Sequence, residues 1–375
     1  MSKRISGDVL RLPRTGLLIA FLFCMSCFAA LCRADNLPDS QAIRLLGEQL
    51  FLDKSLSEDG KESCASCHKP DAAFTDGKRT AVGIHKQAGT RNTPSLLSLS
   101  TTPFFWDGRV SELTTAVLQP FTNPVEMGLR SPDILLKKIK QSHYYQVAFS
   151  QAFRCSTSSS TLPCGMPTPT IEETGQALAA YVSSLDHGSN AYDYYRSGDD
   201  TALSQEAAHG LTLFSGPAHC AECHRITGDP ALFTDLAFHS TLIDSKRVAQ
   251  LPGTAIGVIN QGLSGGDLNA KIESDPIVSE LGRFLVTHDP KDIGSFRTPS
   301  LRNVALTAPY MHDGSAATLR DAVDREIYYR SLQSNQPNTL TEQDRRDLVS
   351  FLQALTDQPR HNALNDRLDS SLLMN

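Results

Sequence analysis

The sequence predicts a mainly α-helical protein that consists of two related halves in tandem, with long loops between the helices. One set of short motifs occurs in the same order in both halves, and each half then ends in an amphipathic helix behind a capping signature. Stretches between the motifs, such as 251–266, are rich in Pro and Gly, so we expect loops there rather than strands.

The first 34 residues have the character of an export signal. Four basic residues precede the apolar run GLLIAFLFCMSCFAAL, and Cys32-Arg33-Ala34 offers small residues for cleavage. A retained membrane anchor is the alternative, but the run is short for a spanning helix. We therefore expect residues 1–34 to be a signal peptide that is cleaved near Ala34.

The net charge of the chain is negative and argues against some classes of partner. Loss of residues 1–34 removes five Lys/Arg and one Asp, which moves the formal charge from −6 to −10. An acidic chain disfavours nucleic acid and anionic membranes, and it suits a basic protein partner or simply solubility.

Two Cys-x-x-Cys-His strings carry the strongest chemical signal, CASCH at 64–68 and CAECH at 220–224. Both sulfurs of such a pair lie on one face of a helical turn and can bond to one haem, while the adjacent histidine ligates the iron. One zinc ion shared by both pairs is the alternative, but zinc pairs usually lie far closer in sequence. The sequence thus predicts two covalently bound haem c groups, held by Cys64, Cys67, His68, Cys220, Cys223 and His224.

After each haem motif the same landmarks recur. The first half continues with AFTDG, RNTPSL and FFWDG, and the second continues with LFTDL, FRTPSL and YMHDG. Duplication of one haem-binding unit explains this order. We assign residues 35–195 to an N-terminal cytochrome c-like domain and 196–375 to a C-terminal one.

Capping signatures predict the helix that closes each half. Thr170-x-x-Glu173 precedes the apolar stripe of the first half, and Thr341-x-x-Asp344 precedes that of the second. Cys155 and Cys164 remain outside the haem motifs. In an oxidising compartment we expect them to form a disulfide that closes a polar loop, with free thiols as the alternative.

Together with NPVEMG and FRTPSLRNVALTAPYMHDG, these motifs make the chain resemble the bacterial di-haem cytochrome c peroxidase and MauG family over essentially all of the mature sequence. The resemblance implies that the N-terminal haem meets peroxide and that the C-terminal haem stores and relays electrons. It also implies one Ca²⁺ between the domains and a tryptophan between the haems.

The resemblance assigns roles to individual residues. Trp106 matches the tryptophan between the haems, and Glu126 matches the carboxylate that moves a proton between the peroxide oxygens. The calcium positions match Asn92, Thr307 and Pro309, the last two through backbone carbonyls.

The sequence departs from the family pattern in both halves. A distal glutamine of the family is replaced by Ala116, and Gln119 could substitute for it. Pro120, which cannot ligate iron, is consistent with an open N-terminal haem. At the corresponding place in the second half stands Glu326, where the family has Met or Tyr, so Tyr328 or else Met311 is the expected distal ligand.

Three further histidines have weaker assignments. His85 lies close to the loop in which peroxidases of this family carry a removable iron ligand, and an exposed loop histidine is the alternative. His239 and His312 are expected to hydrogen-bond haem propionates or backbone rather than to ligate iron.

The resemblance leaves three classes of function. A periplasmic peroxidase would reduce hydrogen peroxide to water with electrons from a small cytochrome c or a cupredoxin. A MauG-like enzyme would oxidise a partner protein at long range, and an electron carrier would have two fully ligated haems. Pro120 and Glu126 argue against the carrier, and we expect the peroxidase. Members of the family are often dimers, so a homodimer is compatible with the resemblance.

Overall fold

The computed structural model describes residues 40–357, apart from 98, 100–102, 154–167, 241–248, 263–264, 335–336 and 338. The expected signal peptide and the Cys155–Cys164 pair lie outside the described residues. No helix within those residues is long and apolar enough to cross a membrane.

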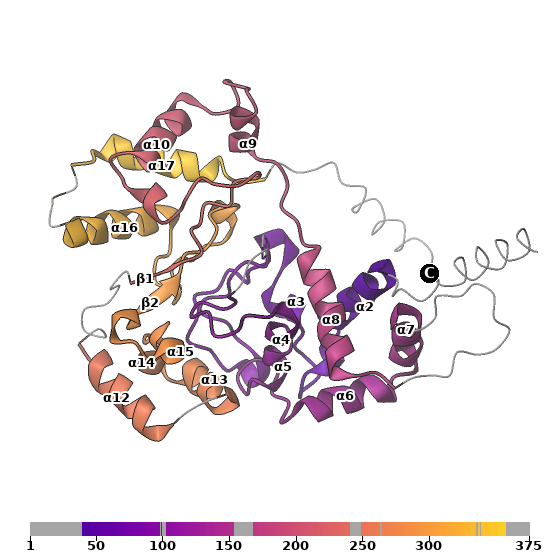
Figure 1. Ribbon diagram of the computed structural model, residues 1–375. Helices are drawn as coiled ribbons and strands as arrows, with labels where there is room; N and C mark the ends of the chain where they lie inside the picture. The colour runs from indigo at the N-terminus through magenta and orange to yellow at the C-terminus, as the bar shows by residue number, and fades with distance from the viewer. Residues whose placement is uncertain are drawn as a thin grey trace, which may run out of the picture.

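The mainly α prediction is confirmed (Figure 1). Strands β1 (Phe238–Ser240) and β2 (Ser295–Arg297) form a two-stranded antiparallel sheet in which His239 pairs with Phe296. Short 3-10 turns punctuate the loops: η1 (Lys54–Leu56), η2 (Pro70–Ala72), η3 (Ile84–Lys86), η4 (Cys220–Glu222), η5 (Pro290–Asp292) and η6 (Val304–Leu306).

A first hydrophobic core lies in the N-terminal half. Its helices are α2 (Ser40–Leu52), α3 (Cys64–Cys67), α4 (Leu113–Ala116), α5 (Gln119–Thr122), α6 (Pro132–Gln141), α7 (His143–Phe153) and α8 (Ile171–Ser183). Helix α8 begins at the predicted capping box, where the Glu173 amide donates to Thr170 Oγ1 at 3.2 Å. Helices α2 and α8 approach closely at Gly47, because any Cβ there would overlap the carbonyl of Ala177.

A second core repeats this arrangement in the C-terminal half, with α9 (Ala191–Arg196), α10 (Gln205–Ser215), α16 (Leu319–Ser334) and α17 (Glu342–Gln353). Helix α17 begins at the predicted box of Thr341 and Asp344. Gly210 allows α10 to lie against the carbonyl of Asp347, as Gly47 does in the first half. The boundary drawn at 195/196 falls inside α9, whose Tyr192 packs in the second core.

A third group of helices corrects the prediction of loops over 251–266. Residues Leu251–Gln261 form α12, followed by α13 (Gly265–Ser274), α14 (Pro276–Ser279) and α15 (Phe284–Thr287). The proline of α12 lies in its first turn, where no intrahelical amide bond is lost. Leu251, Ala255 and Val258 then fall on one face and pack in a separate apolar cluster.

The two halves meet through backbone hydrogen bonds between their repeated motifs. The Asn92 amide donates to the His312 carbonyl at 2.8 Å, and the Arg297 amide donates to the Trp106 carbonyl at 2.8 Å. The RNTPSL motif of the first half therefore pairs with the YMHDG motif of the second half, and the FRTPSL motif of the second half pairs with the FFWDG motif of the first.

Candidate haem-binding sites

The first Cys-x-x-Cys-His string forms a single helical turn, α3, that begins at the first cysteine. The Ser63 amide donates to Ser66 Oγ at 3.0 Å and fixes the start of this turn. His68 follows directly, and its Nδ1 lies 2.9 Å from the Phe74 carbonyl oxygen. A carbonyl can only accept a hydrogen bond, so Nδ1 carries the proton and Nε2 keeps its lone pair.

The second string repeats this geometry on η4. His224 Nδ1 lies 3.0 Å from the Phe233 carbonyl oxygen, which leaves Nε2 of this ring unprotonated as well. Such a bond to a carbonyl sets the tautomer and the ring orientation of a metal-ligating histidine. Both histidines therefore fit the role of a haem iron ligand.

The electrostatics of both strings also fit covalent haem attachment. Burial lowers the pKa of His68 and of His224, which keeps both imidazoles neutral. Burial raises the pKa of Cys64, Cys67 and Cys220 to about 12, so these sulfurs are neutral thiols at neutral pH. A zinc site shared by the two cysteine pairs is not formed among the described residues.

The second site opens into a cavity of about 530 Å³ to which both halves contribute. Cys220, Cys223 and His224 line it from the C-terminal half, while Asn92 and Trp106 line it from the N-terminal half. The Trp106 indole donates to the Asn92 carbonyl at 2.9 Å, which fixes the ring at the boundary. The only tryptophan of the chain and the second haem-binding string thus line the same cavity.

Of the two expected distal ligands, Met311 lines this cavity and Tyr328 does not. Glu326 and Met311 are in its wall. Tyr328 is 60% exposed and is absent from the lining, since its neighbours Ile327 and Tyr329 take the buried positions of the helix. The expectation of Tyr328 as an iron ligand therefore finds no support in the structure.

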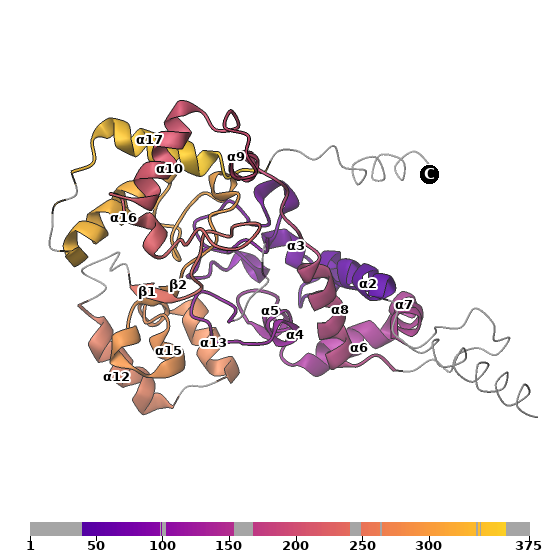
Figure 2. The same ribbon diagram turned by 45° about the horizontal axis from the view of Figure 1, so that its top comes forward.

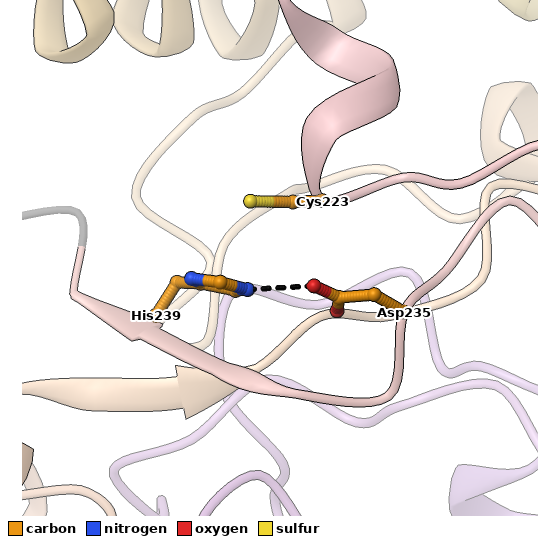
Figure 3. Close-up of side chains that lie close together, drawn as sticks. All are labelled: Cys223, Asp235 and His239. Carbon is orange, nitrogen blue, oxygen red and sulfur yellow. Dashed lines mark hydrogen bonds and ion pairs between the residues drawn. The ribbon is translucent and has the colours of Figure 1, made fainter.

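Cys223, Asp235 and His239 form the one group in the described residues whose donor atoms could share a metal ion (Figure 3). Cys223 belongs to the haem motif, so this group is part of the second site. His239 Nε2 is 2.8 Å from Asp235 Oδ2, and His312 Nε2 is 3.1 Å from Glu280 Oε2. Both histidines thus pair with carboxylate side chains of the protein, and the expected bonds to haem propionates stay a prediction.

Glu126 lies beside the first haem-binding string. Its charge contributes to the raised pKa of both Cys64 and Cys67. Asn123 Nδ2 donates to Glu126 Oε1 at 2.7 Å and orients the carboxyl. Burial, and then the negative charge of Glu273, raise the pKa of Glu126 to about 7, although the guanidinium of Arg109 opposes the shift.

The other sequence-predicted residues of the first site have clear positions. Ala116 is buried in an apolar cluster, while Gln119 is partly buried and accepts a hydrogen bond from Asn269 at 3.2 Å. Pro120 is in the first turn of α5. His85 is exposed at a hairpin tip, where Nε2 is 3.5 Å from Glu58 Oε2.

The three predicted calcium residues lie along the same cavity wall. Asn92 Nδ2 donates to the carbonyls of Lys78 and Arg79, at 2.9 and 3.3 Å. The amide oxygen of Asn92 is therefore left for another donor or a cation, and Thr307 and Pro309 line the same cavity.

Sequence reasoning missed two residues of the first site. Arg109 stands in the FWDGR motif, two residues after Asp107, and this spacing was a usable signal. Its guanidinium lies 3.8 Å from the Phe105 ring centroid and 3.0 Å from Asp107 Oδ2. Glu273 lies far away in sequence within the third helical group, and no motif marks it.

A mainly α chain with two Cys-x-x-Cys-His strings and two oriented histidines has the features of a di-haem c-type protein. A family model described as di-haem cytochrome c peroxidase matches residues 41–201. Methylamine utilization protein MauG from Methylorubrum extorquens is 33% identical over 339 residues, which cover 87% of this chain and 83% of that protein. The chain belongs to the di-haem cytochrome c peroxidase and MauG family.

Other relatives carry the peroxidase name. Cytochrome c551 peroxidase from Nitrosomonas europaea is 30% identical over 324 residues, which cover 86% of this chain and 82% of that protein. The solved structure of the di-haem peroxidase BthA from Burkholderia thailandensis matches with a TM-score of 0.62 and 25% identity, over 87% of this chain and 90% of that one. A MauG-like protein associated with microbial copper homeostasis matches with a TM-score of 0.65 and 28% identity, over 87% and 92%.

Proposed function

We propose that this protein is a periplasmic peroxidase that reduces one hydrogen peroxide to two waters, with two protons and with two electrons from a small cytochrome c or a cupredoxin. The observation that carries this proposal is Glu126, a carboxyl with a pKa of about 7 beside the first haem-binding string. A group that titrates near neutral pH can both accept and release a proton at the working pH.

The two haem c groups would be held by the cysteine pairs and by Nε2 of His68 and His224, and when bound they would supply the redox chemistry. The residues of the chain bind, orient and move protons. Glu126 takes the proton from the near oxygen of peroxide and delivers it to the leaving oxygen, while Asn123 holds the carboxyl in one orientation.

The other residues support a division of labour between the sites. Pro120 has no side-chain donor atom, which suits an open first site where peroxide can bind. Met311 is the expected distal ligand that lines the cavity of the second site, and Glu326 lines it as well. Trp106 lies at the boundary, where an indole can shorten electron transfer between two redox centres.

We also propose one Ca²⁺ at Asn92, Thr307 and Pro309, since oxygen ligands suit this hard cation. The division into two cytochrome c-like domains is supported by the two cores. Export to the periplasm, removal of His85 as a ligand on activation, and a homodimer are further parts of the proposal.

The test is peroxide turnover by the purified di-haem protein with reduced cytochrome c as donor. Glu126→Gln should lower kcat by about 10²–10⁴-fold, because the amide cannot carry the proton. Glu112→Gln is the matched control, as Glu112 is exposed and makes no side-chain cap bond. Unchanged turnover in Glu126→Gln would refute the assigned role.

A MauG-like activity is the second candidate, because a relative that carries that name is 33% identical to this chain. Peroxide treatment without donor separates the two functions. A peroxide-oxidised state that persists and does not consume cytochrome c would favour oxidation of a partner protein. Two low-spin irons that do not respond to peroxide would leave an electron carrier and would exclude both enzymes.

A further inference from the structure

The third helical group is an insertion that the proposed function does not use. In the first half, residues 78–90 connect the FTDG and RNTP motifs, whereas the second half spans 237–295 between the matching motifs. Helices α12 to α15 all lie in this longer segment. In both Figure 1 and Figure 2, α13 is on the side of this group that faces the N-terminal half.

Side chains and backbone of α13 bond directly to the N-terminal half. Asn269 Nδ2 donates to Gln119 Oε1 at 3.2 Å, and Thr90 Oγ1 donates to the Ile272 carbonyl at 2.7 Å. Asn269 and Glu273 are four residues apart, so they share one face of the helix. This face of α13 is therefore the face that the insertion presents to the first site.

Glu273 is the carboxylate on that face, and it is only 7% exposed. It packs against Gly89, since a Cβ at this glycine would lie 2.9 Å from Glu273 Oε2. Gly89 belongs to a short hairpin, residues 81–89, in which the Gly89 amide bonds to the Ala81 carbonyl. Residues nearer the tip of this hairpin contact Glu126. There the Ile84 amide donates to the Glu126 carbonyl at 3.0 Å, and Gly83 packs on the Glu126 backbone.

One hairpin is thus contacted by residues from opposite halves, by the buried Glu273 through its carboxylate and by the partly buried Glu126 through its backbone. Their charges interact, because Glu273 is the second cause, after burial, of the raised pKa of Glu126. A like charge nearby favours the protonated form of a carboxyl. Arg109 acts in the opposite direction, and the Asn123 bond to Glu126 also favours the ionised form.

We propose that Glu273 is a positioning residue of the first site, which the C-terminal half supplies through α13 and which acts on the Glu126 carboxyl across the hairpin that both residues contact. The catalytic meaning of this role rests on the proposed function. The physical claim does not, since it concerns the protonation of one carboxyl in the folded protein. The first site is then complete only when the insertion is docked on it.

The remaining charged groups around the pair do not replace Glu273. Lys271 and Asp275 on the same helical segment pair with each other at 2.8 Å. His85 and Glu58 are on the exposed tip of the hairpin and pair at 3.5 Å. Near Glu126, the thiols of Cys64 and Cys67 are consumed by haem attachment.

The experiment is an infrared pH titration of the protonated carboxyl band of Glu126 in the di-haem protein, with Glu126→Gln to assign the band. Glu273→Gln should move the midpoint of this band to lower pH, by a shift on the order of one pH unit. Asp267→Asn is the control, because Asp267 is an exposed carboxylate on the same helix. It should leave the midpoint in place.

Gly89→Ala provides a second variant if Glu273→Gln does not fold. The new methyl group would displace the Glu273 carboxylate without removing its charge from the chain, and the midpoint should again fall. A midpoint that neither variant changes overturns the inference, even if peroxide turnover is intact. A midpoint that falls in a protein without peroxide turnover would support the role of Glu273 and refute the proposed function alone.

Discussion

Asp107 offers the sharpest test of how the first half is held together. Its side chain is fully buried between two arginines, with Arg91 Nη1 at 2.7 Å and Arg109 Nη1 at 3.0 Å from Oδ2. Burial alone would raise the pKa of Asp107, but the charges of Arg109 and Arg91 outweigh it and hold the pKa below its ordinary value. We predict that Asp107→Asn strongly destabilises the protein.

The magnitude follows from the geometry of the triad. Asn has nearly the same volume, so no cavity forms, and its oxygen can still accept the Arg109 amide bond that Asp107 Oδ1 accepts at 3.1 Å. What is lost is the negative charge between two guanidinium groups, of which Arg91 is only 5% exposed. Removing one partner of a buried ion pair costs about 3–5 kcal/mol.

The assay is urea unfolding of the di-haem protein at pH 7, followed by circular dichroism. A loss of about 3 kcal/mol should lower the midpoint by roughly 1 M. The contribution of Asp107 is present above the unfolded-state pKa of about 3.9 and is lost as the pH falls through the lower folded-state value. The difference between variant and wild type should therefore shrink only in strong acid.

The control is Asp200→Asn, because Asp200 is an exposed aspartate. This change should leave the midpoint within about 0.5 kcal/mol of wild type. If Asp107→Asn unfolds at the same urea concentration as Asp200→Asn, the two arginines are not held by this charge and the reasoning is wrong.

Three further predictions concern other parts of the molecule. Gly210→Ala should lower the unfolding free energy by about 1–3 kcal/mol, because the methyl group would overlap the Asp347 carbonyl. Gly257→Ala, in open space on α12, should instead be neutral or slightly stabilising in the same urea unfolding assay. Glu326→Gln should raise the reduction potential of the second haem at alkaline pH, since a negative charge is removed from its cavity; a potential equal to that of wild type in spectroelectrochemistry would contradict this. Alanine at both Cys220 and Cys223 should leave a protein whose mass contains one covalently bound haem instead of two.

The sequence predicted those features that depend on local chemistry. The Cys-x-x-Cys-His strings fold as single turns, each with its histidine directed by a nearby carbonyl, because the spacing itself requires this. The capping boxes at Thr170 and Thr341 begin helices as expected, since a cap is formed by residues three apart.

Local sequence patterns were less informative where tertiary packing decides whether a segment is helical or which side chains of a helix are buried. The stretch 251–266 contains Gly and Pro, yet most of it is helical, because Leu251, Ala255 and Val258 are buried against a core of their own. Tyr328 and Glu326 differ by two residues on one helix, and only the packing of α16 turns Glu326 into the cavity and Tyr328 into solvent.

The sequence by itself therefore determined the helical class, the family, the paired haem-attachment strings and the candidate proton-moving residue Glu126. The tertiary structure alone decided which groups surround that residue. Glu273 lies almost 150 positions further along the chain, and its charge reaches Glu126 only because α13 docks on the opposite half. Electrostatic influence depends on distance in space and on burial, and neither quantity is written in the spacing of residues along a chain.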